Sequence, residues 1–345
     1  MSDNLVLTNY MTINKSKDYA ISIIRLVSIV LIVMCHFFQY YNNFLAWHFN
    51  IGVQFFLIIS GYLYGLRSEY TVQKVWDGIK KILFDCYIFL FLMIVVSLIF
   101  HHRTDIGLES IWNFLILRQW PPGCAHLWYI PLILFCYMIS PFISLFVNNI
   151  KKFNRIKQIL LKICFLFVAT LIIFRFFTNF NSAWVVAYMG AFLFADEIKE
   201  NRKSFIKFVL PLLIITSIAQ LSNYIKSEVV QGVLNRIFFY RRADTVRVLT
   251  AFTLFSVLYY GLSFIKFKDD IKILNITDKY SYDLYLAHQP VILGSFSLLG
   301  LTCFKFLNIT ITIFAVCAAT ILLIVVCFII KRLFHRNQKV EKNIL

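Results

Sequence analysis

The chain is 345 residues long, and 60% of its residues are hydrophobic whereas only 15% are charged. With a mean hydropathy of +0.75, it has too little polar surface to cover a water-soluble globule, so we expect an integral membrane protein that binds no nucleic acid. The formal net charge of +17 does not change this expectation, because the basic residues lie in short segments between apolar runs and not on one water-exposed face.

Apolar runs recur along the whole chain, and a run of about 20 apolar residues is long enough to cross the hydrocarbon core as a helix. The runs are continuous and do not alternate as barrel strands do. We therefore expect an all-α integral membrane protein of about ten transmembrane helices, near residues 20–41, 50–66, 82–100, 127–148, 159–178, 183–195, 205–222, 248–265, 281–303 and 308–331. The short sixth span, and the second, which begins close to Gly52, are candidates for tilted, broken or partly re-entrant helices.

The distribution of Lys and Arg predicts the orientation. With the N-terminus inside, the cytoplasmic segments hold 24 of these residues and the opposite loops hold nine, so the positive-inside rule places both termini in the cytoplasm. The expected organisation is a cytoplasmic tail (1–19), a single transmembrane domain (20–331) and a basic cytoplasmic tail (332–345). The outer segment 223–247 is unusually basic, and either dips into the protein, faces an anionic partner, or lies at the lipid headgroups as an amphipathic segment.

The first span carries two ionisable residues, Arg25 and His36. They are eleven residues apart, which at 100° per residue places them within about 20° of each other and roughly 16 Å apart along the helix axis. Four more polar residues share this face, so the sequence predicts a polar stripe across the membrane: Ser22, Ser28, Gln39 and Asn43. A charged residue in a span costs about 2.5–3.5 kcal/mol on insertion scales, which favours a functional role. Snorkelling of Arg25 to the interface and a hydrogen-bonded seam between helices are the structural alternatives.

Other polar residues lie at the ends of later spans. His126 and Trp128 enter the fourth span from the side of His36, and Tyr285 and His288 share a face of the ninth span. Histidines at helix ends are often bonded within the protein, so structural and ligand-binding roles both stay open for them.

A basic patch flanks the second and third spans, and it consists of Arg67, Lys74, Lys80 and Lys81. Phosphate recognition is one interpretation of these side chains, and ordinary positive-inside charge is the other. Seven of the eight cysteines fall inside apolar runs and none forms a CxxC pair, so we expect no metal site.

Four segments, in order and at the ends of spans, resemble the membrane-bound acyltransferase 3 family, which O-acylates cell-surface polysaccharides and related glycans. They are the Arg and His separated by ten residues (Arg25 and His36), the segment Gly52–Tyr62, the segment His126–Ile130 followed by Ser140-Pro141, and the segment Ser281–Pro290. The chain departs from the family where it carries Lys80, Lys81 and Asp85 in place of an Arg-rich run.

This resemblance implies an O-acetyltransferase in the plasma membrane of a bacterium, with acetyl-CoA as the acyl donor and co-substrate. The donor phosphates are then expected near Arg25, Arg67, Lys80 and Lys81, with the pantetheine arm along the polar stripe. His36 is the expected base that takes the proton of the acceptor hydroxyl.

The acceptor, a cell-surface polysaccharide or its lipid-linked precursor, is expected to meet His126, Trp128, Tyr285, His288 and Ser60. Ser60 also suggests a covalent acyl-enzyme, but no base adjoins it in sequence and the glycine that follows it indicates a close-packed turn, so direct transfer is favoured. A transporter or flippase of a lipid-linked glycan is the alternative class, although the sequence shows neither inverted repeats nor matching interrupted spans.

Overall fold

The computed structural model describes residues 18–67, 71–101, 107–176, 182–200, 202–222, 242–265, 271–294 and 296–344. Every regular element in these ranges is a helix, which confirms the all-α class. The elements in chain order are α2 (Tyr19–Tyr40), α3 (Leu45–Phe49), α4 (Ile51–Gly65), α5 (Val72–His101), α6 (Leu108–Leu115), the 3-10 helix η1 (Ala125–Trp128), α7 (Tyr129–Ile150), α8 (Arg155–Phe176), α9 (Ser182–Leu193), α10 (Ala195–Glu200), α11 (Arg202–Ser222), α13 (Arg242–Leu262), α14 (Lys272–Ile292) and α15 (Lys305–Ile344).

Each of the ten expected spans overlaps one of these helices. Within the described residues, α2, α5, α7 with η1, α8 and α15 are long and apolar enough to cross a membrane, and α9, α11 and α13 contain shorter apolar stretches. The ninth span differs most from its expected bounds, because α14 begins at Lys272 and ends at Ile292. Its first turns carry polar residues, and one of them, Asp278, is bonded to Ser22 and Arg25 of α2.

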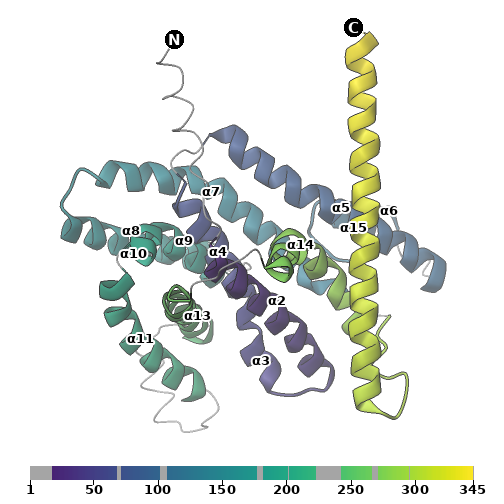
Figure 1. Cartoon of the computed structure of the whole chain (residues 1–345), viewed down its shortest axis with the longest axis horizontal. Helices are drawn as coiled ribbons and strands as arrows, with labels where there is room; N and C mark the ends of the chain where they lie inside the picture. Colours follow the sequence, from purple (N-terminus) through teal and green to yellow (C-terminus); the bar gives the residue numbers. More distant parts are fainter. Residues whose placement is uncertain are drawn as a thin grey trace.

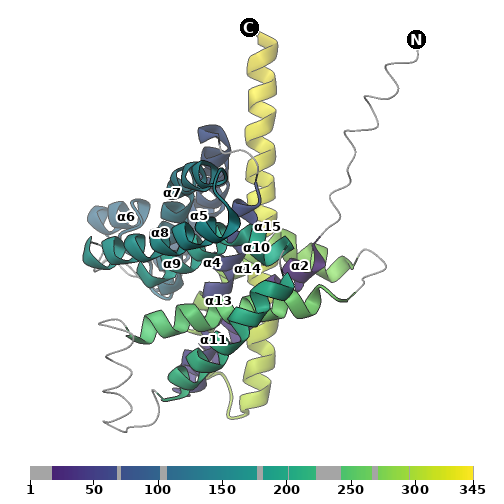
Figure 2. The ribbon, with the colours of Figure 1, turned by 90° about the vertical axis from the view of Figure 1, so that its left-hand side faces the viewer.

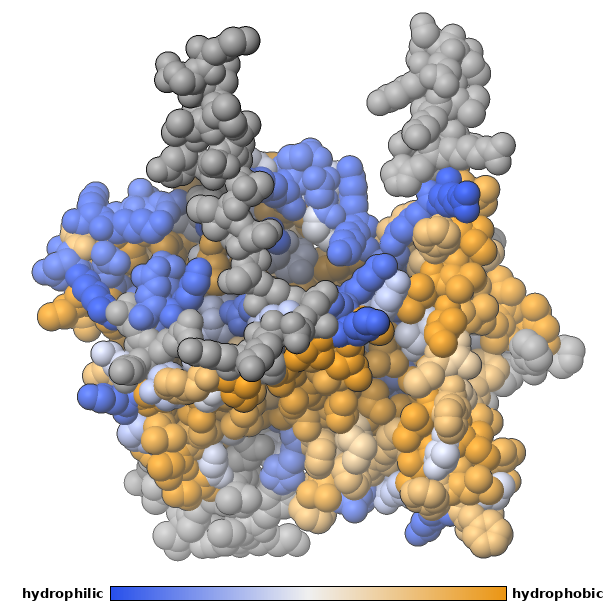
Figure 3. Space-filling model, viewed as in Figure 1, coloured by the Kyte–Doolittle hydropathy of each residue, from blue (hydrophilic) through white to orange (hydrophobic). Residues whose placement is uncertain are grey.

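The helices form one bundle in which α4 and α14 are central (Figures 1 and 2). Helix α4 packs against α2 and α9, whereas α14 packs between α2 and α15. Helix α15 stands at the edge of the bundle, and its helical structure continues to Ile344, so residues 332–344 of the expected tail are an extension of this helix. Hydrophobic side chains form a broad band on the face seen in Figure 3, and hydrophilic ones gather above it, as expected for a bundle surrounded by lipid.

Close backbone contacts fix the position of α4. A Cβ atom on Gly61 would overlap the carbonyl oxygen of Tyr188 in α9, and one on Gly52 would lie 2.5 Å from the carbonyl oxygen of Ser28 in α2. The expected close packing after Ser60 is therefore present, but the expected turn is not, because α4 is an unbroken helix from Ile51 to Gly65. The basic segment 223–247 lies outside the described residues up to residue 241, as does most of the tail 1–19.

Candidate active site

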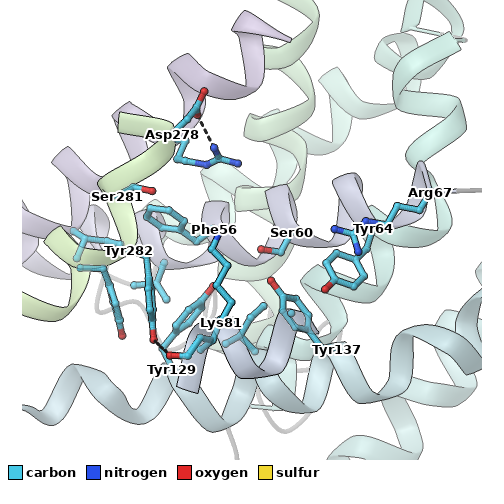
Figure 4. A pocket seen from close by; sticks show the side chains of 17 residues that line it. Phe56, Ser60, Tyr64, Arg67, Lys81, Tyr129, Tyr137, Asp278, Ser281 and Tyr282 are labelled. Carbon is cyan, nitrogen blue, oxygen red and sulfur yellow. Dashed lines mark hydrogen bonds and ion pairs between the residues drawn. The ribbon is translucent and has the colours of Figure 1, made fainter. Parts of the chain in front are cut away.

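A cavity of about 410 Å³ opens between five helices at the end of the bundle where α2, α5 and α14 begin and α4 ends. Its volume is within the range of small-molecule and cofactor sites. The side chains around it are shown in Figure 4. The lining residues are Arg25, Ile32, Val53, Phe56, Ser60, Tyr64, Arg67, Gly78, Lys81, Ile82, Tyr129, Ile133, Tyr137, Asp278, Ser281, Tyr282 and Tyr285.

The charges in the lining favour an anion. Arg67 and Lys81 are exposed, whereas Arg25 lies deeper and its Nη1 atom is 2.5 Å from Oδ1 of Asp278. The other carboxylate oxygen of Asp278 accepts a hydrogen bond of 2.6 Å from Ser22. Arg25 is thus held toward the protein by α14 and does not snorkel freely, and the lining carries three cations against one carboxylate. Such a cavity attracts a polyanionic ligand.

Tyrosines form much of the remaining wall. The rings of Tyr64 and Tyr137 are stacked with centroids 4.5 Å apart, and the guanidinium carbon of Arg67 lies 3.9 Å from the centroid of the Tyr64 ring. Figure 4 shows the hydroxyl of Ser60 facing that of Tyr137. Among the described residues that line this cavity there is no histidine, so the lining gives Ser60 no evident base.

Three histidines from distant parts of the chain form a cluster next to the cavity. The His288 ring centroid in α14 is 5.0 Å from that of His36 in α2 and 5.1 Å from that of His126 in η1. Tyr285 joins the cluster to the cavity, because it lines the cavity and its ring centroid lies 5.2 Å from that of His126 and 5.7 Å from that of His288. The Tyr285 hydroxyl donates to the carbonyl oxygen of His126.

The nitrogens of His126 both face oxygen atoms. Its Nδ1 atom is 2.7 Å from Oε1 of Gln289, which also accepts the backbone N–H of His126 at 2.6 Å, and its Nε2 atom is 3.0 Å from the carbonyl oxygen of Leu286. These bonds tie η1 to α14. They leave His126 without a free ring nitrogen for proton transfer.

His288 is bonded differently. It has no exposed surface, its Nδ1 atom lies 2.6 Å from the carbonyl oxygen of Tyr285, and its Nε2 atom has no hydrogen-bond partner among the described residues. His36 is half-buried, and its Nδ1 atom is 2.7 Å from Oε1 of the exposed residue Gln39. The cluster therefore extends from an accessible residue, through His36, to a fully buried histidine.

The structure brings most of the expected site residues into these two groups. Arg25, Arg67, Lys81, Ser60 and Tyr285 line the cavity, and the three histidines form the cluster. Two residues lie elsewhere: the Nζ atom of Lys80 is 5.5 Å from the Trp76 ring centroid, and Trp128 packs edge-on against Trp184 with ring centroids 5.1 Å apart. Lys80 differs from Lys81 because successive residues on a helix point about 100° apart.

The expected polar stripe on α2 is interrupted. Ser28 is fully buried, and its hydroxyl donates to the carbonyl oxygen of Ile24 at 2.6 Å. It is therefore not available to a substrate that passes along the helix.

Sequence reasoning missed Asp278 and the tyrosines contributed by α4 and α7. Asp278 is seven residues before Tyr285 and so lies on the same face of α14. The seven-residue spacing could therefore have identified Asp278, but the expected ninth span began only at residue 281.

Together these features define a class of protein: a multi-pass helical membrane protein with a basic, tyrosine-walled cavity and a histidine cluster at its deep end. The chain belongs to acyltransferase family 3, because the family model described as an acyltransferase domain matches residues 18–332, nearly the whole chain. No curated protein and no solved structure matches it. The resemblance seen in the four sequence segments is thereby confirmed, and the protein is a membrane acyltransferase.

Proposed function

We propose that this acyltransferase moves an acetyl group from cytoplasmic acetyl-CoA to a hydroxyl of a cell-surface polysaccharide, or of its lipid-linked precursor, in a bacterial plasma membrane. The observation that carries the proposal is the junction at Tyr285, where a basic cavity meets a histidine cluster. Acyl transfer from CoA needs an anion-binding entrance on one side of the thioester and a base for the acceptor hydroxyl on the other.

The donor enters at the basic end of the cavity. Arg67 and Lys81 at the mouth bind the CoA phosphates through charge-assisted hydrogen bonds, and Lys80, one residue away, adds positive charge outside the lining. Arg25 reaches the pyrophosphate or the upper part of the pantetheine arm from its ion pair with Asp278. The arm then lies between the tyrosines, and the thioester lies next to Tyr285.

The acceptor approaches from the side of Gln39 and His36, which are the accessible end of the cluster. His36 takes the proton of the hydroxyl as that oxygen attacks the thioester carbonyl, and Gln39 orients the imidazole. His126 has no free nitrogen and acts by fixing η1 to α14. Trp128, also on η1 but outside the cluster, offers an aromatic face that suits a sugar ring. Transfer is direct, since no histidine accompanies Ser60 in the cavity lining.

A purified preparation in proteoliposomes, supplied with labelled acetyl-CoA and an acceptor glycan, tests the proposal. We expect His36→Ala to lower the turnover rate about 10²–10⁴-fold, the usual contribution of a general base, and Arg25→Gln to raise the KM for acetyl-CoA. Lys157→Ala removes an exposed cation on α8, away from the cavity, and serves as the matched control with wild-type kinetics. Wild-type rates in both site variants would refute the mechanism, and glycan movement across sealed vesicles without CoA would identify a transporter instead.

A further inference from the structure

The depth of the cavity follows from the helices around it. On α4 the lining extends from Val53 to Tyr64, eleven residues later in an unbroken helix, which corresponds to roughly 16 Å at 1.5 Å per residue. The guanidinium carbon of Arg67 lies 3.9 Å from the centroid of the Tyr64 ring, so a positive charge of the mouth lies level with Tyr64. Figure 4 shows Phe56, Ser60 and Tyr64 following one another along this helix.

The far end of the cavity is closed by apolar side chains. Ile32 of α2 is 2% exposed and Val53 of α4 is 7% exposed, whereas Arg67 and Lys81 at the mouth are exposed. The two helices approach closely at this end, because a Cβ atom on Gly52, next to Val53, would lie 2.9 Å from Cγ1 of Ile32. A ligand that enters at the mouth therefore ends against Ile32 and Val53.

The pantetheine arm of CoA is about as long as this cavity. About thirteen covalent bonds separate its phosphate from its sulfur, and an extended chain gains about 1.2 Å per bond, which gives about 16 Å. With its phosphate at the Arg67 guanidinium, the arm places the sulfur level with Val53 and leaves room beyond it for only a short acyl group. This end is also the one nearer to His36, which follows Ile32 by about one helical turn on α2.

Among the described residues, the far end also has no cation for an acidic acyl group. The described lining holds three cations, which are Arg25, Arg67 and Lys81. The deepest of them, Arg25, precedes Ile32 by seven residues, or roughly 10 Å along α2, and is paired with Asp278. A carboxylate at the far end would therefore be buried without a partner, which is costly.

We propose that Ile32 and Val53 determine which acyl group the enzyme transfers, and that they restrict it to a short, uncharged group such as acetyl. A butyryl group adds two methylenes that would meet these side chains, and one methylene in an apolar pocket changes kcat/KM about 10–200-fold. A succinyl group has a chain of the same length as butyryl and adds a negative charge. The inference rests on the proposed function, because it requires acyl-CoA in the cavity.

A series of donors tests the assignment in proteoliposomes with one acceptor glycan. For the wild type we expect kcat/KM to be at least about 100-fold lower with butyryl-CoA and with succinyl-CoA than with acetyl-CoA. Ile32→Ala removes three side-chain carbons at the far end, so the butyryl penalty should fall below about tenfold while the succinyl penalty persists. The two longer donors separate size from charge, because their acyl chains are equally long.

The matched control is Ile29→Ala. Ile29 is also on α2 and also 2% exposed, but it is not among the residues that line the cavity. This variant loses the same three carbons and should keep the wild-type ratio of butyryl to acetyl transfer. Val53→Ala provides a second variant in case Ile32→Ala fails to fold, and it should also lower the butyryl penalty.

The assignment is overturned if the wild type uses butyryl-CoA or succinyl-CoA as well as it uses acetyl-CoA. It is overturned equally if Val53→Ala or folded Ile32→Ala keeps the wild-type ratio, or if Ile29→Ala changes that ratio as much as they do. If the wild type transfers an acyl group from none of the three donors, it is the proposed function itself that fails.

Discussion

Gly61 provides a direct test of how α4 is held in place. An alanine Cβ there would lie 3.0 Å and 3.1 Å from the carbonyl carbon and Cα of Tyr188, and closer still to its carbonyl oxygen. These atoms are backbone, so relief requires a shift of α9 as a whole. Overpacking of this kind costs about 3 kcal/mol, and the higher helix propensity of alanine offsets about 1 kcal/mol. We therefore expect Gly61→Ala to destabilise the protein by about 2 kcal/mol.

Thermal unfolding of the purified protein in detergent measures this effect. A loss of about 2 kcal/mol corresponds to a fall of about 4 °C in the apparent melting temperature. Gly190→Ala on α9 is the matched control, because its Cβ would meet no atom closer than 3.7 Å, and it should leave the melting temperature unchanged or slightly raised. If the two variants have the same apparent melting temperature, the close approach of α4 to α9 does not exist as described. Acyl transfer should also fall in Gly61→Ala, because α4 carries Ser60 into the cavity.

Three further predictions concern the cavity and one buried ion pair. Gly78→Leu should raise the KM for acyl-CoA at least tenfold in steady-state assays, because a Cβ at this lining position already comes within 2.8 Å of a tyrosine hydroxyl. Asp278→Asn should lower kcat/KM for the donor about tenfold, the effect of losing one charged hydrogen bond to Arg25; equal kinetics would show that the pair does not position the arginine. Lys162→Met should destabilise the protein by about 3–5 kcal/mol, since it leaves Glu197 buried and unpaired, and the double variant with Glu197→Leu should recover most of that loss in melting experiments.

The positions of the helices could be predicted because lipid imposes a length and a composition on any segment that it surrounds. The rule fails where protein surrounds the helix instead. Helix α14 carries Asn275, Asp278 and Lys279 in its first turns, and a hydropathy argument assigns such residues to a loop. Asp278 is bonded to Ser22 and Arg25 of α2, and such tertiary contacts are encoded by no single segment.

The site residues show the same limit. Helical spacing alone placed Arg25 and His36 on one face of α2 and placed Tyr285 and His288 on one face of α14. It could not pair Arg25 with Asp278, which lies 253 positions along the chain. Nor could it distinguish His126, whose ring nitrogens both face oxygen atoms, from His288, whose Nε2 atom has no hydrogen-bond partner in the described part of the chain, because this difference arises from how η1 meets α14.

The route proposed for the donor also depends on contacts between helices. A stripe on α2 alone would carry the pantetheine arm past Ser28, but that residue is buried and its hydroxyl is bonded to its own helix. Of the polar stripe, only Arg25 lines the cavity, and the lining continues on α14 through Asp278, Ser281 and Tyr285. Beyond the cavity, the ring of His36 in α2 lies next to that of His288 in α14. Since both helices contribute to the cavity and to the histidine cluster, changes on α14 at Tyr285 and His288 should affect acyl transfer as strongly as changes to the arginine and histidine of α2.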